Sequence, residues 1–372
     1  NLIINVNQFY LMKKTFLFNK HSQLGAKISN FAGFQMPISY SSVNNEHLHV
    51  RNSAGIFDVS HMGEILISGK NSTKLLQRIC SNDISKLDPG MAQYNCITNF
   101  EGGIIDDLIV YQIELDKYLL VVNASNIQKD YTWILDQNKA FNSTISDESN
   151  NYSLLAIQGP KAIDYCQNFT DVDLKEIKNY SHVTSKFNNC NDILLSKTGY
   201  TGSGGLEIYI PNKDVVNIWD SLFKFNKNET LMPIGLAARD TLRIEMGYCL
   251  YGNDINDDIS PIEAGLSWIT KPETECIGYE IFKNQISNGI KKKLVGFKLN
   301  NRGIPRAGYK IYNSSHKEIG VTTSGTFSPV LKKGIGLGYI NIESLGTDKD
   351  IYIKIRDEFI ESVIVKPPFI EI

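Results

Sequence analysis

The hydrophobic and polar positions of this chain follow two spacings, and each spacing predicts a different kind of element. Apolar residues that recur every three to four positions indicate helices with one buried face. This spacing is found at 21–30, 71–80, 126–139, 161–168, 215–225 and 236–246. Short apolar or alternating runs rich in branched residues indicate strands. They are found at 64–68, 93–99, 105–113, 118–122, 152–158, 193–197 and 206–210.

The order of these elements predicts an α+β fold, because hairpins and helices are mixed rather than alternating as they do in a doubly wound sheet. A further helix is expected to begin after the capping residue Ser42 and to end near Arg51. Beyond Lys291 the chain changes to short strands separated by Gly, Asn and Pro. This pattern of short strands and turn residues predicts a separate β-barrel or sandwich of about 80 residues. The charged stretch 271–293 is the expected connection.

Composition narrows the class of protein. The chain has 372 residues, 42% apolar and 21% charged, which is typical of a globular protein with a substantial core. The formal net charge is −2 with both signs interspersed, so no nucleic-acid partner is expected. No apolar stretch is long enough to span a bilayer. The 6 cysteines are scattered without a CxxC pair, which favours buried, reduced thiols.

Residues 1–11 differ in composition from the segment that follows them. Residues 1–11 are mildly apolar and carry no basic residue, whereas Met12 and the two lysines after it read as an ordinary start. A secretory signal would need its charge before the apolar segment, so that assignment is not favoured. We therefore expect 1–11 to be an N-terminal extension outside the fold.

Two adjacent carboxylates, Asp106 and Asp107, interrupt an apolar strand-like run that follows Gly102 and Gly103. Side chains on a strand alternate between its faces, so at most one of the two acids can face a pocket. A buried carboxylate loses solvation worth several kcal/mol as an order of magnitude, which makes it a candidate functional group. The alternative is that both acids lie in water at the mouth of a hairpin.

The glycine-rich turn 199–205 does not have the spacing of a dinucleotide-binding loop, and a strand follows it instead of a helix. Glu207 on that strand is either an exposed carboxylate or an acceptor for paired N–H donors of a planar heterocycle. Arg239 and Arg243 lie four residues apart on one face of the helix 236–246. They either form ion pairs or present donors to an anionic or carbonyl-bearing ligand.

Other catalytic patterns find little support. His47 and His49 are not spaced to converge on one helix face, and no cluster of thiolates or carboxylates is near them, so no metal site is expected. His61 is interpreted as a hydrogen-bonded structural residue. No Gly-x-Ser-x-Gly elbow occurs, so covalent catalysis is not favoured.

Eight collinear blocks of the chain resemble the T-protein of the glycine cleavage system, the aminomethyltransferase. The blocks are 31–34 with 36–37, 54–63, 102–111, 158–160, 198–202, 235–245, 250–254 and 323–329. The resemblance runs from Lys14 to the C-terminus, and eight matches in one order are hard to obtain by chance.

The resemblance implies a three-part, cloverleaf-like α+β body. Its folate-binding region is expected over 12–272, with one subdomain of 12–54 plus 140–272 and another of 55–139. A C-terminal β-barrel domain is expected over 291–372.

The resemblance also implies a reaction. Proteins of this family take an aminomethyl group from the lipoyl arm of the H-protein, pass its carbon to tetrahydrofolate and release ammonia. The other products are 5,10-methylenetetrahydrofolate and the dihydrolipoyl arm, and the P- and L-proteins are indirect partners. Such a site needs a carboxylate that orients the folate amines and favours developing positive charge, without a metal or a nucleophilic side chain. The implied location is the bacterial cytoplasm or, in a eukaryote, the mitochondrial matrix.

Residue by residue, the resemblance assigns Asp107 as the catalytic aspartate, and its neighbour Asp106 is expected to turn away. Glu207 matches the pterin-binding glutamate of the family. The other positions implied to line the folate pocket are Tyr94, Asn123, Tyr200, Arg239 and Tyr248, with Met62 and Trp268 as apolar contacts. Arg306 matches an arginine near the cavity through which the lipoyl arm enters.

Two departures from the family pattern limit this assignment. Ser203 and Gly204 replace two acids of the family turn, which is expected to loosen the loop. The segment 365–372 lacks the basic tail of many relatives. Two alternative functions are a folate-dependent demethylase, although no flavin fingerprint is found, and a non-catalytic folate-binding protein of iron–sulfur assembly, although 199–207 contains no cysteine.

Overall fold

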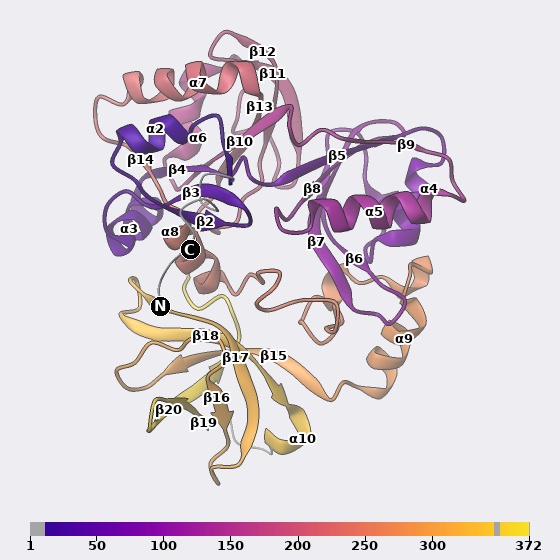
Figure 1. Ribbon diagram of the computed structural model, residues 1–372, viewed down its shortest axis with the longest axis vertical. Coiled ribbons are helices and arrows are strands. Elements are labelled where there is room, and N and C mark those ends of the chain that lie inside the picture. Colours follow the sequence, from indigo (N-terminus) through magenta and orange to yellow (C-terminus); the bar gives the residue numbers. More distant parts are fainter. Residues whose placement is uncertain (1–11, 346–349, 372) are drawn as a thin grey trace.

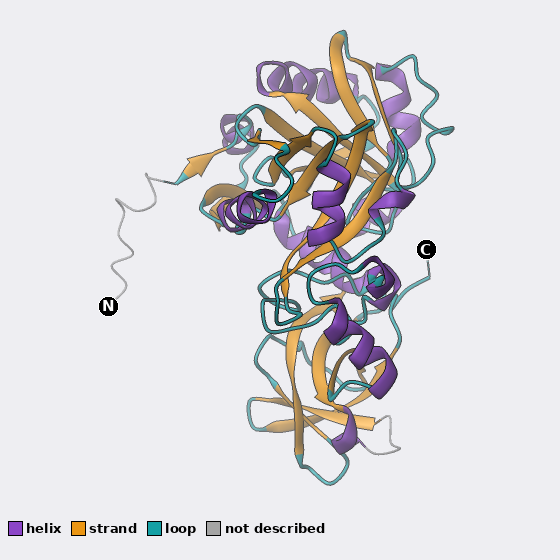
Figure 2. Cartoon of the chain, turned by 90° about the vertical axis from the view of Figure 1, so that its right-hand side faces the viewer, coloured by secondary structure: helices purple, strands orange, loops and turns teal. Residues whose placement is uncertain are grey.

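The computed structural model describes residues 12–345 and 350–371. These residues form three lobes around a common centre: two mixed α+β lobes and a C-terminal barrel (Figures 1 and 2). The predicted α+β class and the separate barrel are confirmed. The N-terminal extension predicted at 1–11 lies outside the described residues.

The first lobe is built on a six-stranded sheet in the order β11-β12-β13-β10-β4-β14. Its strands are β4 (Ala54–Asp58), β10 (Tyr152–Gln158), β11 (His182–Phe187), β12 (Cys190–Ser196), β13 (Gly205–Pro211) and β14 (Leu231–Pro233). Helices α6 (Ala162–Cys166) and α7 (Asn212–Phe225) cover one face of this sheet, because their apolar residues share one core with it. A small sheet of β1 (Lys13–Lys14), β3 (Phe34–Ser39) and β2 (Lys27–Phe31) lies beside it.

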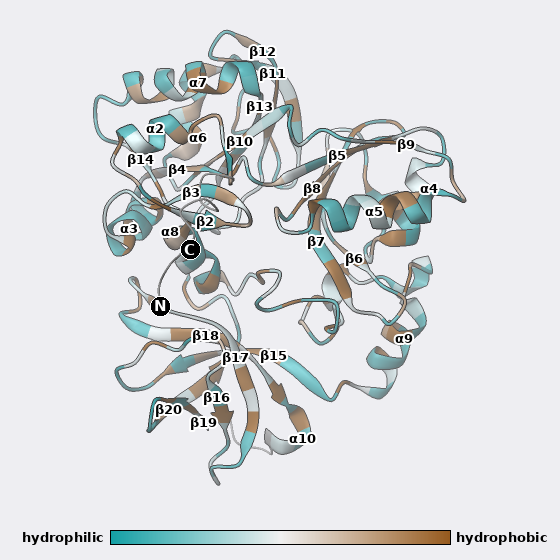
Figure 3. Ribbon diagram, in the orientation of Figure 1, coloured by the Kyte–Doolittle hydropathy of each residue, from teal (hydrophilic) through white to brown (hydrophobic). Residues whose placement is uncertain are grey.

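The second lobe has a five-stranded sheet in the order β6-β7-β8-β5-β9. Its strands are β5 (Gly63–Ser68), β6 (Ala92–Thr98), β7 (Ile104–Glu114), β8 (Lys117–Val122) and β9 (Thr144–Asp147). Helices α4 (Ser72–Ile79) and α5 (Ile127–Asn138) bury leucines and isoleucines against this sheet. Figure 3 shows hydrophobic residues gathered in the strands, whereas α5 and α7 carry residues of both kinds, as surface helices should.

The third lobe is a closed barrel in the order β15-β18-β17-β16-β19-β20. Its elements are β15 (Lys292–Leu299), β16 (Lys310–Tyr312), β17 (Glu318–Ser328), β18 (Lys333–Asn341), α10 (Ile342–Leu345), β19 (Asp350–Ile355) and β20 (Glu358–Val365). Closure pairs the outer strands with each other, so the barrel exposes no free strand edge. Helix α9 (Tyr279–Asn288) lies in the connection before the barrel.

Most predicted elements are present, but the helix expected at 21–30 is wrong. Helix α2 (Phe18–Gln23) stops after Gln23, and the chain then enters β2. Gly25 has a φ of +72°, a conformation that favours glycine and ends the helix. Among the helices and strands before the barrel, those that were not predicted are helix α9 and the strands β1, β2, β3, β4, β9, β11 and β14.

Strand pairing bears on the subdomain boundaries, which remain a proposal. Strand β4 belongs to the sheet of the first lobe, although all of it except Ala54 lies beyond the boundary placed at 54/55. Strand β9 pairs with β5 in the second lobe, although it lies beyond the boundary at 139/140. The strand pairing therefore favours subdomain boundaries near residues 59 and 148, where the chain passes from one lobe to the other.

Helix α8 (Leu236–Met246), whose bounds agree with the predicted ones, joins the first lobe to the barrel. The buried Arg243 guanidinium donates to Asp254 Oδ2 at 2.6 Å and to Ser324 Oγ at 2.8 Å on β17. Glu245 accepts hydrogen bonds from Arg51 on α3 (Val43–Asn52) and from Ser328 of the barrel. The ion-pair alternative therefore holds for Arg243, and α8 fixes how the lobes meet.

Candidate functional site

A cavity of about 1440 Å³ lies where the three lobes meet. Residues from both sheets, from α8 and the loop after it, and from the barrel strands β15, β18 and β20 line its wall. Its volume exceeds the several hundred Å³ of a typical single-ligand pocket, so it has room for two reactants.

Strand β7 enters this cavity from a close contact with the loop that follows α8. Gly102 has a φ of +79°, and a Cβ on Gly103 would lie 1.6 Å from the carbonyl oxygen of Asp257. Only glycine fits at this contact. The Gly-Gly pair thus sets the register at which the following residues meet the cavity.

The two aspartates point in opposite directions, as strand alternation predicted. Asp107 lines the cavity together with Leu108 and Ile109, and Asp106 does not. The Asp107 carboxylate accepts hydrogen bonds from Tyr94 Oη at 2.9 Å and from Asn123 Nδ2 at 2.9 Å. Asp106 is fully buried behind the strand, so the alternative of two acids in water is excluded.

The surroundings of Asp107 raise the pKa of its carboxyl group above that of an aspartate in water. Burial, followed by the charge of Asp106, raises the pKa of Asp107 to about 7, although the hydrogen bonds from Tyr94 and Asn123 work in the opposite direction. A carboxyl group with a pKa near neutrality can exchange a proton or stabilise a cation under physiological conditions.

Glu207 on β13 is also buried, and it lines the same cavity. Its Oε2 accepts a hydrogen bond from Thr198 Oγ1 at 2.5 Å. The Thr198 hydroxyl in turn contacts Tyr111 Oη at 3.0 Å and Ser196 Oγ at 2.9 Å. The exposed-carboxylate alternative is therefore excluded, and this hydroxyl chain orients Glu207 as an acceptor.

Arg239 contributes a partly buried cation to the site. Its guanidinium carbon lies 4.8 Å from the ring centroid of Tyr200 and 5.9 Å from that of Phe57. Burial lowers the pKa of Arg239, whereas the charge of Glu207 raises it. The buried Nη1 atom has no hydrogen-bond partner, so a ligand carbonyl or anion in the cavity would satisfy it.

Aromatic side chains line two sides of the cavity. The rings of Tyr200 and Tyr248 stack with centroids 5.8 Å apart, and the Tyr200 hydroxyl donates to the Cys249 carbonyl oxygen. The rings of Tyr94 and Trp268 lie 6.0 Å apart, and Trp268 is 59% exposed. Planar side chains of this kind suit a flat heterocyclic ligand.

The structure brings nine of the predicted site residues together on the wall of this cavity. They are Met62, Tyr94, Asp107, Asn123, Tyr200, Glu207, Arg239, Tyr248 and Trp268. Arg306, the tenth, is exposed in the loop between β15 and β16 and is not among the lining residues, so its role stays a prediction.

The glycine-rich turn before Glu207 is held by side chains. Arg51 Nη1 donates to Ser203 Oγ at 2.6 Å and to the Thr201 carbonyl oxygen at 2.6 Å. Thr201 Oγ1 donates to Gln158 Oε1 at 2.9 Å. Ser203, which departs from the family pattern, thus contributes an acceptor that ties the turn to α3.

His61 is a cavity residue that sequence reasoning did not select. Its Nδ1 atom is buried without a hydrogen-bond partner, so the expected hydrogen-bonded role does not hold for that atom. Burial lowers the pKa of His61 to about 4; Arg239 adds to this effect and Asp58 opposes it. The ring is therefore neutral near pH 7. Cys249, Lys293 and Lys366 also line the cavity, and no motif in the sequence pointed to them.

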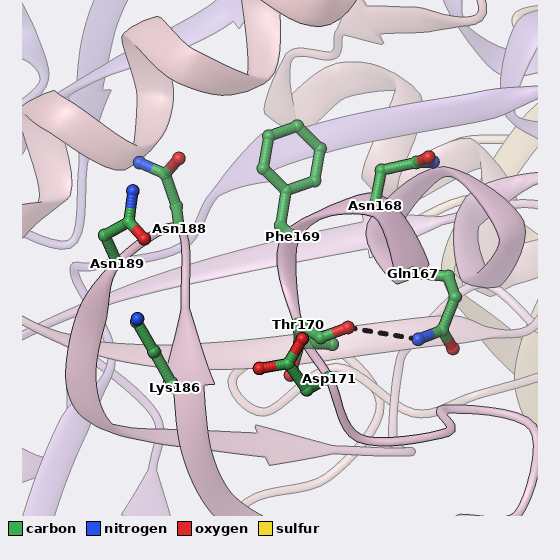
Figure 4. A pocket seen from close by; sticks show the side chains of 8 residues that line it. All are labelled: Gln167, Asn168, Phe169, Thr170, Asp171, Lys186, Asn188 and Asn189. Carbon is green, nitrogen blue, oxygen red and sulfur yellow. Dashed lines mark hydrogen bonds between the residues drawn. The ribbon is translucent and has the colours of Figure 1, made fainter.

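A second hollow of about 400 Å³ lies on the outer edge of the first lobe. It is lined by 167–171, Lys186, Asn188 and Asn189, none of which is buried. Figure 4 shows that their polar ends point in different directions, and the dashed line joins Gln167 to the Thr170 carbonyl oxygen. This arrangement does not support a binding site.

The described residues, 12–345 and 350–371, lack two further kinds of feature. Within them, no group of three or more His, Cys, Asp or Glu residues is arranged to hold a metal ion. None of the described helices is long and apolar enough to cross a membrane.

Comparisons with known proteins give one consistent result. Residues 17–274 match the family model described as the GCVT N-terminal domain, and residues 292–371 match the glycine cleavage T-protein C-terminal barrel domain. The chain is 50% identical to an aminomethyltransferase from Flavobacterium psychrophilum, over 96% of this chain and 99% of that protein. It is 47% identical to an aminomethyltransferase from Porphyromonas gingivalis, again over 96% and 99%.

A solved structure shows the same likeness. The glycine cleavage system aminomethyltransferase T from Bartonella henselae superposes with a TM-score of 0.89 at 30% sequence identity. The superposition covers 96% of this chain and 98% of that one.

Proposed function

Because the chain belongs to the glycine cleavage T-protein family and is an aminomethyltransferase, we propose that its cavity binds tetrahydrofolate beside the aminomethylated lipoyl arm of an H-protein. The observation that carries this proposal is the pairing of Asp107 and Glu207. Two carboxylates in distinct environments, the buried Glu207 and the partly buried Asp107, line one cavity that is large enough for two reactants.

In the proposed reaction, the carbon–sulfur bond of the aminomethyl group breaks and the sulfur leaves with the bonding electrons. The resulting iminium-like carbon is attacked by N5 of the folate, and closure onto N10 expels ammonia. The protons of N5 and N10 end on the dihydrolipoyl sulfur and on ammonia, so atoms and charges balance. The Asp107 carboxylate supports this sequence by orienting the folate amines and by stabilising the positive charge that develops on the carbon.

Glu207 and Arg239 are assigned to the heterocycle. The Glu207 carboxylate accepts paired N–H donors from the pterin ring, and the unpartnered Arg239 Nη1 donates to a ring carbonyl or to a carboxylate of the ligand. Tyr200, Tyr248 and Trp268 supply the flat surfaces. Holding both reactants in line can supply about 7 to 11 kcal/mol in favourable intramolecular cases.

The H-protein and its lipoyl arm are the proposed donor, with Arg306 near the entry of the arm. The relatives reported above are bacterial proteins, and we propose a cytoplasmic location for this chain.

The test of this function combines binding with turnover. Isothermal titration should show tetrahydrofolate binding to the chain at a single site. Addition of aminomethylated H-protein should then produce methylenetetrahydrofolate and ammonia in equal amounts. Binding without any product would contradict the proposed transfer and favour a folate-binding protein without catalysis.

A further inference from the structure

A second buried carboxyl group lies behind the catalytic strand, at a place that the proposed reaction does not use. Asp130 on α5 is fully buried, and neither of its oxygens receives a hydrogen bond from an N–H or O–H group of another described residue. Its carboxyl neighbour is Asp106, whose charge acts on Asp130 more strongly than that of any other group and which accepts from Asn126, one turn before Asp130. Two buried carboxyls in contact are compatible only if they share a proton, because two anions would repel each other.

The donors around the pair decide which carboxyl holds that proton. Asp106 accepts three N–H groups: the backbone nitrogen of Asn123 at 2.9 Å, its Nδ2 at 2.8 Å and Asn126 Nδ2 at 2.6 Å. Three such donors stabilise the anion, whereas Asp130 has none. Burial, followed by the charge of Asp106, raises the pKa of Asp130 well above its ordinary range. Asp130 is therefore the acid and Asp106 the anion.

One amide connects this pair to the cavity. Asn123 Nδ2 lies 2.8 Å from Asp106 Oδ1, 2.9 Å from Asp107 Oδ1 and 3.0 Å from the Asp107 carbonyl oxygen. The Asp106 anion thus holds the same amide group that donates to the Asp107 carboxylate.

We propose that Asp130 is a positioning residue whose carboxylic acid donates to Asp106, so that Asp106 holds Asn123 against Asp107 and does not compete with Asp107 for a proton. The inference rests on the proposed function only in taking Asp107 as the catalytic carboxylate. The proton between Asp130 and Asp106 is a property of the folded chain alone.

The other titratable groups that face Asp106, Asp107 and Asp130 are either neutral or already hydrogen-bonded to another residue. Asp130 is faced by Asp106 and Asp107 from β7, by Lys129 of its own helix and by Tyr251. Lys129 donates to the Tyr251 hydroxyl at 2.5 Å. Burial raises the pKa of each neutral group that faces Asp107, so these groups do not titrate near pH 7. They are Tyr94, Cys96, Tyr200 and Cys249.

Two substitutions separate the acid from other roles. Asp130→Asn keeps the shape and supplies an uncharged N–H donor to Asp106. Asp130→Val removes the donor and leaves an apolar side chain of similar bulk. The readouts are the pH profile of kcat for methylene transfer and the tetrahydrofolate affinity, which also reports folding.

Asp130→Asn should leave the acidic limb of the profile within about 0.3 pH units of the wild type, because the donor is retained. Asp130→Val should move that limb to lower pH by about one unit, because Asp106 then competes with Asp107 for the proton and the charge that raises the Asp107 pKa is partly lost. Without Asp130, the remaining pair of Asp106 and Asp107 must hold the proton between them. A shift of the limb in Asp130→Asn, or an unshifted limb in a folded Asp130→Val, would overturn the proposal.

An infrared difference spectrum between wild type and Asp130→Asn at pH 8 gives a readout that needs neither turnover nor the valine variant. The wild type should show the carbonyl stretch of a protonated carboxylic acid, and the asparagine variant should lack it. Absence of that band would contradict the shared proton. If Asp107→Asn kept full turnover while the band was present, the catalytic role proposed for Asp107 would be wrong and the carboxyl pair would stand.

Discussion

At the scale of single residues, the site depends on the different surroundings of three carboxylates. Asp107 faces the cavity with a raised pKa, Asp106 is an internal acceptor and Glu207 is oriented by a hydroxyl. The local sequence does not distinguish the roles of these carboxylates, because all three lie on strands among apolar residues. Their roles follow from the donors that each one meets.

Asp107→Asn should abolish most turnover and leave tetrahydrofolate binding nearly unchanged, because the amide keeps the shape but cannot stabilise positive charge. The initial rate of methylenetetrahydrofolate formation is the measurement. In the wild type the same rate should fall as the pH drops through about 7, since the raised pKa of Asp107 means that the anion is lost there. A rate that is flat from pH 8 to pH 6 would argue against this role.

Asp106→Asn is the matched comparison, and the structure changes what is expected of it. Strand alternation alone predicts that this variant keeps most of its turnover. The buried contacts of Asp106 with Asn123 and Asn126 predict a partial loss of turnover, because an amide cannot accept all three N–H groups. The acidic limb should also move to lower pH, since the charge that raises the Asp107 pKa is removed. If turnover and the acidic limb of this variant were the same as in the wild type, the hydrogen bonds of Asp106 with Asn123 and Asn126 would not matter for catalysis.

Glu207→Gln should weaken tetrahydrofolate binding by about 1.5 to 3 kcal/mol, roughly 10- to 150-fold in Kd, because one acceptor oxygen becomes an amide donor. Thr198→Val keeps the carboxylate but removes the hydroxyl that orients it, so a smaller loss is expected. Titration calorimetry measures both. Equal affinities in the wild type and Glu207→Gln would remove Glu207 from the pterin site.

At the scale of elements, short polar contacts hold α2 against the first sheet. Asp58 at the end of β4 accepts from Thr15 Oγ1 at 2.7 Å and contacts His21 Nε2 on α2 at 2.8 Å. Burial alone would raise the pKa of Asp58, but the hydrogen bond and charge of His21 outweigh it and lower this pKa to about 2. Helix α2 is short, so this contact matters for its placement.

The Asp58 contact predicts an acid-sensitive contribution to stability. A carboxyl whose pKa is lower in the folded state stabilises the fold above its unfolded pKa near 4, and this contribution is lost as the pH falls towards 2. From a shift to about 2, the contribution is about 2 kcal/mol. Urea unfolding at pH 5 and pH 3 should show the loss of about half of this contribution, about 1 kcal/mol, with Asp58→Asn as the control that lacks this titration. The same pH dependence in wild type and control would refute the assignment.

At the scale of the whole molecule, the cavity exists only because three lobes are held in one arrangement. Arg243 and Asp254 are both almost fully buried, and Ser324 of the barrel joins them. The neighbouring Glu245 links α3, α8 and the barrel. Loss of these contacts should therefore change stability and ligand binding together.

Arg243→Ala should lower the free energy of unfolding by about 3 to 5 kcal/mol, because Asp254 is left as a buried, unpaired charge. Lys310→Ala, which breaks the exposed pair with Glu318, is the matched control and should have a much smaller effect. Thermal and urea unfolding measure both. Similar midpoints for the two variants would contradict a structural role for the buried pair.

Much of the fold was predictable from local pattern, because long amphipathic helices such as α8 and buried strands such as β10 carry strong periodicity. The failures have local causes as well. The helix expected at 21–30 was interrupted by Gly25, and β9 has too few apolar positions to stand out. Nine of the ten site residues lie together, although their positions came from the family resemblance and not from spacing.

The sequence pattern by itself determined the α+β class, a separate C-terminal β domain and the opposite faces of Asp106 and Asp107, since alternation along a strand is a local property. Only the tertiary structure decided that Asp106 is buried, that Asp130 faces it and that His61 enters the cavity. Those facts depend on helix α5 and on loops far apart in the chain, which local spacing does not place. The proton affinity of Asp107 follows from that packing, because burial and neighbouring charge set it.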